Sequence, residues 1–232
     1  MKYIFIHLRV MVFIVCYVIK AFTPSNIHFP SFAYTHLINE QNIIDKVFFA
    51  PRDAETIEAV LVGLIQSTQT SISGALFRLS NKRIIQELIA AHKRGVIIDV
   101  ILDPSALSAS QEISKLSHAG IPLSLCTLRY GILMHHKFLI FKDTLACPEN
   151  NLTPIPAVVA TGSLNLTEHG FSNRENINFR DNVQIVNAFI QENTALKAET
   201  DRYVLTRKKS SKAGEYLKKF IPYILALKRF LH

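Results

Sequence analysis

From position 46 onwards, short apolar runs alternate with segments whose apolar residues have helical spacing. Residues 47–50 form an apolar run stopped by Pro51, which predicts a strand. Residues 54–68 then carry apolar side chains at every third or fourth position, as one face of a helix does. Asp53, directly before this segment, is a residue type typical of an N-cap. This part of the chain is therefore predicted to open with a strand and a helix.

The same alternation continues through the first half of the chain. The pattern predicts, in order, a strand at 70–76, a helix at 81–94 ended by Gly95, a strand at 96–102 ended by Asp103 and Pro104, a serine-rich helix near 108–119 ended by Gly120, and a strand at 121–126. Strands that alternate with helices predict an α/β sandwich around a mixed, largely parallel sheet. The loops that follow the strands of such a sheet are its usual ligand sites.

The second half of the chain has fewer helical segments. We predict strands at 135–141, 157–161 and 176–180, followed by a helix at 181–198. Residues 142–156, between the first two of these strands, are polar and rich in proline. We expect this stretch to be an excursion at an edge of the sheet, where it shapes access of the substrate.

The N-terminal segment differs from the rest of the chain. Its apolar run Val10–Ile19 lies between Arg9 and Lys20 and is ten residues long. This length suits a signal peptide better than a membrane-spanning helix, which needs roughly 20 residues. A short membrane anchor is the alternative, and the sequence leaves cleavage open. We therefore predict a signal peptide or anchor over 1–24, a linker over 25–45, and a protein that is exported, either periplasmic or secreted, or anchored at a membrane.

Charge divides the remaining chain into a neutral body and a basic tail. The net charge is +8, and the composition, 49% hydrophobic, excludes a disordered chain. Residues 202–232 hold nine Lys or Arg against Glu215 alone, whereas residues 1–201 hold 17 basic and 17 acidic side chains. The predicted tail, 201–232, has an amphipathic basic pattern that favours an anionic membrane surface. A solvated helix or packing on the domain is the alternative.

Candidate chemistry is concentrated in two short stretches, MHHKFLIF and TGSLNLT. Residues two apart on a strand face the same side, so His135 and Lys137 are expected to project together and His136 away from them. A neutral imidazole beside an ammonium group can act as nucleophile and clamp for a phosphodiester. Ser163 and Asn165 can hydrogen-bond phosphoryl oxygens without adding charge. Glu175 can accept a hydrogen bond from the far ring nitrogen of His135 and fix its tautomer.

Each of these pieces alone is weak, but their order and strand contexts are specific. The segments HHKFLIF, TGSLNLT and NREN resemble the phospholipase D superfamily, whose signature is His-x-Lys, an Asp and then Gly-Ser-x-Asn. The resemblance is to its small single-motif members, namely bacterial secreted nuclease-like and phospholipase D-like proteins and the mitochondrial cardiolipin hydrolase branch. It covers about residues 46–200, which we take as the catalytic domain.

The resemblance implies a phospholipase D-like α/β/α sandwich and a metal-independent mechanism with no cofactor. His135 would form a covalent phosphohistidine, and the same residue of a second subunit would protonate the leaving oxygen, so a homodimer would complete the site. Lys137 and Asn165 would clamp the phosphoryl oxygens, Ser163 would assist, and Glu175 would orient His135. Arg78 is a weaker candidate for contact with substrate phosphate.

The chain departs from the family pattern at one position. The family's Asp stands five residues after the lysine, where this chain has Lys142, and the nearest acid is Asp143. The sequence also leaves the state of Cys126 and Cys147 open. One disulfide between them is possible, and no ligand spacing supports a zinc site built from them with His135 and His136.

Two classes of function follow from these features. We expect a phospholipase D-type phosphodiesterase that hydrolyses phospholipid or nucleic acid, the alternative within this class being an endonuclease that acts on DNA or RNA. Transphosphatidylation, with an alcohol in place of water, is open as well. The alternative of another class is a non-catalytic, membrane-tethered binding module. The neutral body argues against a dedicated nuclease, whose cleft would be basic.

Overall fold

The computed structural model describes the central part of the chain. The residues it describes are Leu37, 44–109, 111–126, 133–146, 153–199 and 201–203. The predicted leader, nearly all of the predicted linker and the tail beyond residue 203 lie outside these residues, so those expectations stay predictions. None of the helices among the described residues combines the length and the apolar character needed to cross a membrane.

The described elements alternate between strands and helices over most of the domain. In chain order they are β1 (Asp45–Ala50), α3 (Ala54–Ser67), β2 (Thr68–Leu76), α4 (Lys82–Lys93), β3 (Ile97–Leu102), α5 (Ser105–Ala109), α6 (Glu112–His118), β4 (Leu123–Leu125), β5 (Lys137–Ala146), β6 (Thr153–Gly162), α7 (Glu168–Ser172), β7 (Glu175–Arg180), α8 (Val183–Ala198) and β8 (Asp201–Tyr203). The predicted serine-rich helix is thus two short helices, α5 and α6.

One eight-stranded sheet carries the domain, in the order β1-β7-β6-β5-β2-β3-β4-β8. The α/β class and the mixed sheet are confirmed. The expectation that the sheet is largely parallel is wrong, because five of the seven described pairings are antiparallel and only β2-β3 and β3-β4 are parallel. Only six residues separate β5 from β6, whereas a crossover to a parallel neighbour takes about a dozen or more.

The polar stretch 142–156 is not an excursion at the sheet edge. Lys142 pairs with Ser71 on one side and Ala157 on the other, and Thr144 pairs with Ile155, so most of the stretch extends β5 and β6 in the middle of the sheet. A bulge interrupts the pairing of β2 and β5 at this point, and Asp143 adopts a positive φ of 54°. Its carboxylate accepts a hydrogen bond from the hydroxyl of Thr70. Polarity was therefore a misleading sign of a loop here.

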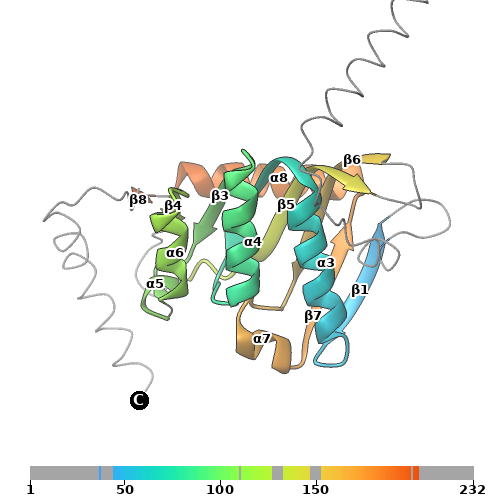
Figure 1. Cartoon of the computed structure of the whole chain (residues 1–232), viewed down its shortest axis with the longest axis horizontal. Coiled ribbons are helices and arrows are strands. Elements are labelled where there is room, and N and C mark those ends of the chain that lie inside the picture. Colours follow the sequence, from blue (N-terminus) through green and yellow to red (C-terminus); the bar gives the residue numbers. More distant parts are fainter. Residues whose placement is uncertain are drawn as a thin grey trace, which may run out of the picture. The chain divides into compact units, whose positions relative to one another are not determined.

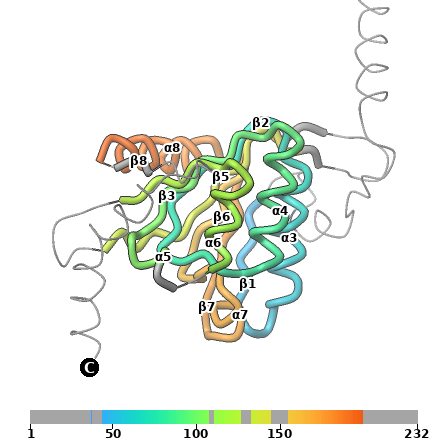
Figure 2. Tube along the Cα trace, turned by 60° about the vertical axis from the view of Figure 1, so that its left-hand side comes forward, coloured from blue at the N-terminus to red at the C-terminus, as the bar shows by residue number. Residues whose placement is uncertain are grey.

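Helices cover both faces of the sheet (Figure 1). Helices α3, α4 and α6 lie over one face and α8 lies over the other, and Figure 2 shows α8 and the α3–α4 pair on opposite sides of the strands. Successive side chains of β5 point to opposite faces of the sheet. Leu139 and Phe141 belong to the core under α3 and α4. Phe138 and Ile140 belong to the core under α8. This is the expected α/β/α sandwich.

The helix ends follow the predicted signals with one difference. Asn81 caps α4 by accepting a hydrogen bond from the backbone of Ile84, and Gly95 and Gly120 adopt positive φ just after α4 and α6. Asp53 stands at the N-cap position of α3, but its carboxylate accepts from the backbone N–H of Phe49 at 2.9 Å rather than from the helix. The predicted position is right and the predicted contact is wrong.

Replacing Gly74 by alanine is expected to destabilise the domain. Strands β2 and β5 approach so closely at Gly74 that a methyl group there would lie 2.2 Å from the carbonyl oxygen of Phe138. Since backbone cannot move aside cheaply, we expect a loss of about 3 kcal/mol in the free energy of unfolding. Urea unfolding followed by circular dichroism measures it. Ser73→Ala, the neighbouring half-buried position, is the control, and equal unfolding midpoints for the two variants would contradict the expectation.

Candidate functional site

All five residues singled out from the sequence lie at one end of the sheet. Because β5 runs antiparallel to β2 and β6, and β7 antiparallel to β6, the C-terminal ends of β2, β3 and β6 meet the N-terminal ends of β5 and β7 there. This is the end of the sheet at which α7 lies in Figure 1. The five residues are His135, Lys137, Ser163, Asn165 and Glu175.

His135 and Lys137 lie in contact at the start of β5. The Lys137 Nζ atom is 3.1 Å from Nδ1 and 3.3 Å from Nε2 of His135, and it donates to the His135 carbonyl oxygen at 2.9 Å. His136 faces the opposite side, where its Nε2 is 3.1 Å from a carboxylate oxygen of Glu192 on α8. The predicted sidedness of the three residues is correct. The observed strand begins two residues later than predicted, at Lys137, so His135 lies just before it, and it continues past residue 141 to Ala146.

Glu175 lies on the same side of the sheet as this pair. Lys137 pairs with Leu76, and Glu175 pairs with Ala50, and both partners belong to the core under α3 and α4. Strand alternation therefore directs both side chains to that side. Among the described residues, Glu175 makes no hydrogen bond to His135. The charge of its carboxylate instead raises the pKa of Lys137 and so favours the protonated ammonium. The expected orienting contact is thus absent in the single chain.

The Gly-Ser-x-Asn loop is fixed against the start of β7. The backbone N–H groups of Ser163 and Leu164 both donate to the carbonyl oxygen of Asn176, at 3.1 and 3.2 Å. The Ser163 hydroxyl accepts from the backbone N–H of Asn176 at 3.1 Å. A methyl group at Gly162 would lie 2.2 Å from the Asn176 carbonyl oxygen, so glycine is needed for this approach. The loop is therefore held without any substrate.

The side chain of Asn165 is set for donation rather than acceptance. Its Oδ1 atom is enclosed and has no hydrogen-bond partner among the described residues. The Nδ2 atom of the same amide is not enclosed and makes no hydrogen bond within that part of the chain. An unpaired buried oxygen costs about 1–3 kcal/mol. Such an amide, with its N–H groups open, is suited to bind an anionic oxygen.

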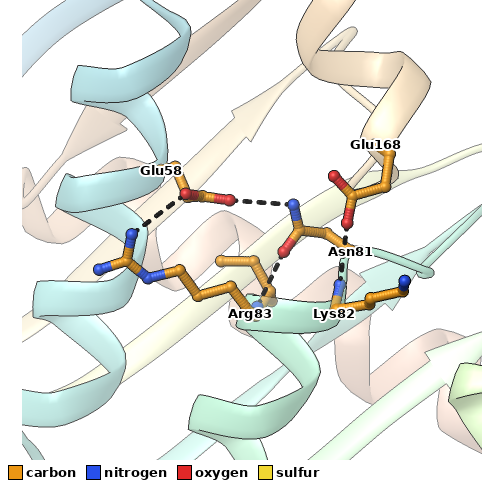
Figure 3. Close-up of polar contacts among 6 residues, drawn as sticks. Glu58, Asn81, Lys82, Arg83 and Glu168 are labelled. Carbon is orange, nitrogen blue, oxygen red and sulfur yellow. Dashed lines mark hydrogen bonds and ion pairs between the residues drawn. The ribbon is translucent and has the colours of Figure 1, made fainter.

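A polar network joins this loop to the loop after β2 (Figure 3). The Asn81 side chain donates to Glu58 at 3.0 Å, Arg83 pairs with the same carboxylate at 3.3 Å, and a Glu168 oxygen accepts from the backbone N–H of Lys82 at 3.2 Å. The backbone N–H groups of residues 80 and 81 also donate to the Leu166 carbonyl oxygen. The segments 77–82 and 163–168 are thus held as one unit.

Two residues of the site were not singled out from the sequence. The Phe77 ring lies 4.4 Å from the His135 ring between centroids, and Lys137 Nζ lies 5.1 Å from the centroid of the Phe77 ring. Asp103 is buried, and its Oδ2 accepts from the backbone N–H of Met134, next to His135, at 3.1 Å. Asp103 had been identified only as the end of a strand. The sequence signal that could have identified Asp103 is a carboxylate at the end of a buried strand. Phe77 offers no such signal, because its sequence context is that of an ordinary core residue.

The environment of the pair favours a neutral imidazole. Partial desolvation first, then the Lys137 ammonium and His136, lower the pKa of His135, while the Asp103 carboxylate opposes them. Desolvation also lowers the pKa of Lys137, with Glu175 opposing it. A His135 pKa below its ordinary value raises the fraction of the ring that is uncharged, the form able to act as a nucleophile, at any given pH.

The segment 142–156 and the pair Cys126 and Cys147 lie only partly within the described residues. The described parts of the 142–156 segment, 142–146 and 153–156, belong to β5 and β6 and lie toward the other end of the sheet from this site; residues 147–152 lie outside the described residues, so an effect of the segment on substrate access stays a prediction. Cys126 is buried, and Cys147 lies outside the described residues, so whether the two form a disulfide stays open. Among the described residues, no three His, Cys, Asp or Glu side chains are grouped to hold a metal ion.

Comparison with known proteins supports one family. Residues 61–196 match the family described as "Cardiolipin synthase, PLD-like domain". The chain is 31% identical over 153 residues to mitochondrial cardiolipin hydrolase of Xenopus laevis, a match covering 65% of each chain, just under two thirds. It is 26% identical over 191 residues to the Danio rerio mitochondrial cardiolipin hydrolase, covering 82% of this chain and 77% of that protein.

Solved structures show the same fold. Nuc from Salmonella typhimurium, described as a phospholipase D family member, superposes with a TM-score of 0.55 at 20% identity, covering 69% of this chain and 98% of that chain. NucT from Helicobacter pylori superposes with a TM-score of 0.58 at 16% identity, covering 69% and 99%. At these identities the likeness establishes architecture alone.

Proposed function

The chain belongs to the phospholipase D superfamily, and on that premise we propose that it is a phosphodiesterase that hydrolyses phosphodiester bonds through a covalent intermediate on His135. The observation that carries the proposal is the contact of His135 with Lys137 at the end of the sheet that also holds Ser163 and Asn165. The relatives named as hydrolases support a hydrolytic reaction.

The proposed reaction has two displacement steps at phosphorus. A ring nitrogen of His135 attacks, the bond from phosphorus to the leaving oxygen breaks, and that oxygen takes a proton from the partner subunit's His135. The partner's His135 then removes a proton from water, whose oxygen attacks phosphorus and breaks the bond to His135. Lys137 and the Asn165 amide bind the phosphoryl oxygens, and Ser163 assists. Glu175 orients the imidazole once the substrate is bound.

A homodimer follows from the single motif. The described site supplies one imidazole next to one ammonium group, whereas the reaction needs a nucleophile and a separate acid. Two copies related by a two-fold axis, with this end of each sheet facing the other, would supply both. No metal or cofactor enters this scheme, because Lys137 from each subunit offsets the developing negative charge.

We propose phospholipid as the substrate class. The names of the cardiolipin hydrolase relatives support it, as do the apolar leader and the basic tail of this sequence. The basic tail would bring the domain to an anionic membrane surface, and the leader would export or anchor it. Nucleic acid is the competing substrate within the family, and a non-catalytic binding module is the competing function.

An assay on four substrates tests the proposal. Purified protein is incubated with phosphatidylcholine, cardiolipin, single-stranded DNA and duplex DNA, with and without EDTA, and released product is quantified. We expect hydrolysis of a phospholipid at a rate that EDTA changes by less than about two-fold. Complete loss of activity in EDTA would contradict the metal-free scheme. Cleavage of DNA alone would favour the endonuclease, and binding without turnover would favour the module.

A further inference from the structure

We infer that Phe77 is a positioning residue for the reaction proposed above, and that its ring is the platform on which the His135 imidazole and the Lys137 ammonium are held together. The inference rests on the proposed function for its catalytic meaning. The positioning of the two groups is inferred from the contacts that the Phe77 ring makes with the His135 imidazole and the Lys137 ammonium.

Three groups contact one another in this arrangement. The centroids of the Phe77 and His135 rings are 4.4 Å apart at an interplanar angle of 52°, and Lys137 Nζ is 5.1 Å from the Phe77 centroid. The ring separation is at the short limit of the range of about 4.5–7 Å at which aromatic pairs attract, and the ammonium distance lies within the cation–π range of about 6 Å. Since Lys137 Nζ also contacts His135, each group of the three is fixed by the other two.

The position of the ammonium leaves the nucleophile open. Lys137 Nζ is nearly the same distance from both ring nitrogens of His135, 3.1 and 3.3 Å. A donor in the imidazole plane cannot be equally close to both nitrogens without colliding with the ring carbons, so the ammonium lies over the ring face. The in-plane lone pair of the neutral imidazole is therefore not occupied by Lys137 and can attack phosphorus.

The imidazole has few other constraints in the single chain. His135 precedes β5, its side chain is exposed, and it makes no hydrogen bond to Glu175 within the described part of the chain. A histidine in this setting would sample several rotamers. Contact with a ring that is itself fixed removes that freedom before the substrate arrives, which is the condition for an efficient attack.

Phe77 is fixed from both sides. Its backbone N–H donates to the His136 carbonyl oxygen at 2.8 Å, which extends the pairing of β2 and β5 one residue past Leu76 and Lys137. Beyond it, Leu79 bridges to Leu166, and the network around Asn81 fixes the end of the loop (Figure 3). The platform therefore moves with the sheet and with the Gly-Ser-x-Asn loop, not independently of them.

Three variants test the platform. Phe77→Leu keeps an apolar side chain and removes the ring, Phe77→Tyr keeps the ring, and Phe48→Leu is the matched control, because Phe48 is a half-buried ring packed edge-on against Phe179 away from the site. For Phe77→Leu we expect kcat to fall roughly 30-fold with KM within about three-fold, since a misplaced nucleophile costs turnover rather than binding. Phe77→Tyr should keep at least about a third of kcat, and Phe48→Leu should match the wild type.

A second readout does not depend on turnover. The carbon-13 resonance of the His135 Cε1 atom is titrated by NMR in each variant. Removing the ring lets water reach the imidazole, so the titration midpoint of His135 should rise in Phe77→Leu and stay unchanged in Phe77→Tyr and Phe48→Leu. Lys137, His136 and Asp103 are the charged or titratable groups that act on this imidazole, and all three are present in every variant.

The outcomes separate this inference from the proposed function. A wild type that cleaves none of the substrates sinks the function, while the titration still tests the platform. A wild-type enzyme with activity that Phe77→Leu retains in full overturns the platform alone. Equal loss in Phe77→Leu and Phe77→Tyr, loss in Phe48→Leu as large as in Phe77→Leu, or an unmoved His135 midpoint in Phe77→Leu would overturn it as well.

Discussion

Replacing His135 by alanine is expected to lower kcat/KM by roughly 10⁴-fold or more, because in the proposed mechanism the variant has no nucleophile on either subunit and no acid for the leaving oxygen. Initial rates on the substrate identified in the four-substrate assay measure the loss. Wild-type protein quenched in alkali during turnover should also carry a mass increase on the peptide that contains His135, matching the phosphoryl-linked part of the substrate. The alanine variant should carry none.

The neighbouring histidine is the control for this variant. His136 is on the same segment, but it faces α8, where it contacts Glu192. We expect His136→Gln to keep kcat/KM within a few-fold of the wild type, since surface contacts of this kind contribute about 0–1 kcal/mol. Equal activity in the two variants, or an adduct on a peptide that lacks His135, would rule out the proposed nucleophile.

Replacing Lys137 by methionine is expected to have two effects. Loss of the clamp should lower kcat by about 10³-fold, as loss of a preorganised charge that stabilises the transition state does. Loss of the ammonium should also raise the pKa of His135, because that charge disfavours the imidazolium form. In the proposed mechanism the nucleophile is the neutral ring, so the acidic limb of the pH profile of kcat/KM should move to higher pH.

Two further variants test whether the charge of Lys137 causes the expected rise in the pKa of His135. Lys142→Met removes a positive charge from the same strand on the opposite side of the sheet and should leave the NMR titration midpoint of His135 unchanged. Asp103→Asn removes the charge that favours the imidazolium form and should lower the midpoint. A midpoint that falls in Lys137→Met, or that moves equally in Lys142→Met, would show that the electrostatic account of His135 is wrong.

Local periodicity was sufficient for most of the elements and for part of the site, but the short helix α7 and the short strand β8 were not predicted. Strand alternation alone places Lys137 and His136 on opposite sides of β5, and the Gly-Ser-x-Asn stretch ends β6 as expected. Partners of strands are not encoded in periodicity, so the antiparallel pairing of β5 with both β2 and β6 was not predicted. The polar residues of β5 read as a loop because their side chains are polar, and side-chain polarity does not reveal the backbone pairing with β2 and β6.

The residues that surround His135 were harder to predict. Phe77 is an apolar residue after a strand, a pattern that also describes most core residues, and only the fold brings its ring to His135. The buried Asp103 acts on His135 through the backbone of Met134, a contact between segments about 30 residues apart in sequence. The absence of a contact between Glu175 and His135 depends on side-chain geometry, which residue spacing does not determine.

The hairpin of β5 and β6 keeps its own connection away from the candidate site. From Lys137 to Ala146 the strand spans roughly 30 Å, so Ala146 and Thr153 lie at the end of the sheet opposite to Lys137 and Gly162. Each doubling in length of a flexible connection costs only about 0.6 kcal/mol of closure entropy. Residues added between Ala146 and Thr153 should therefore cost little stability and leave the geometry around His135 unchanged, whereas a change of length just before Lys137 would displace the imidazole.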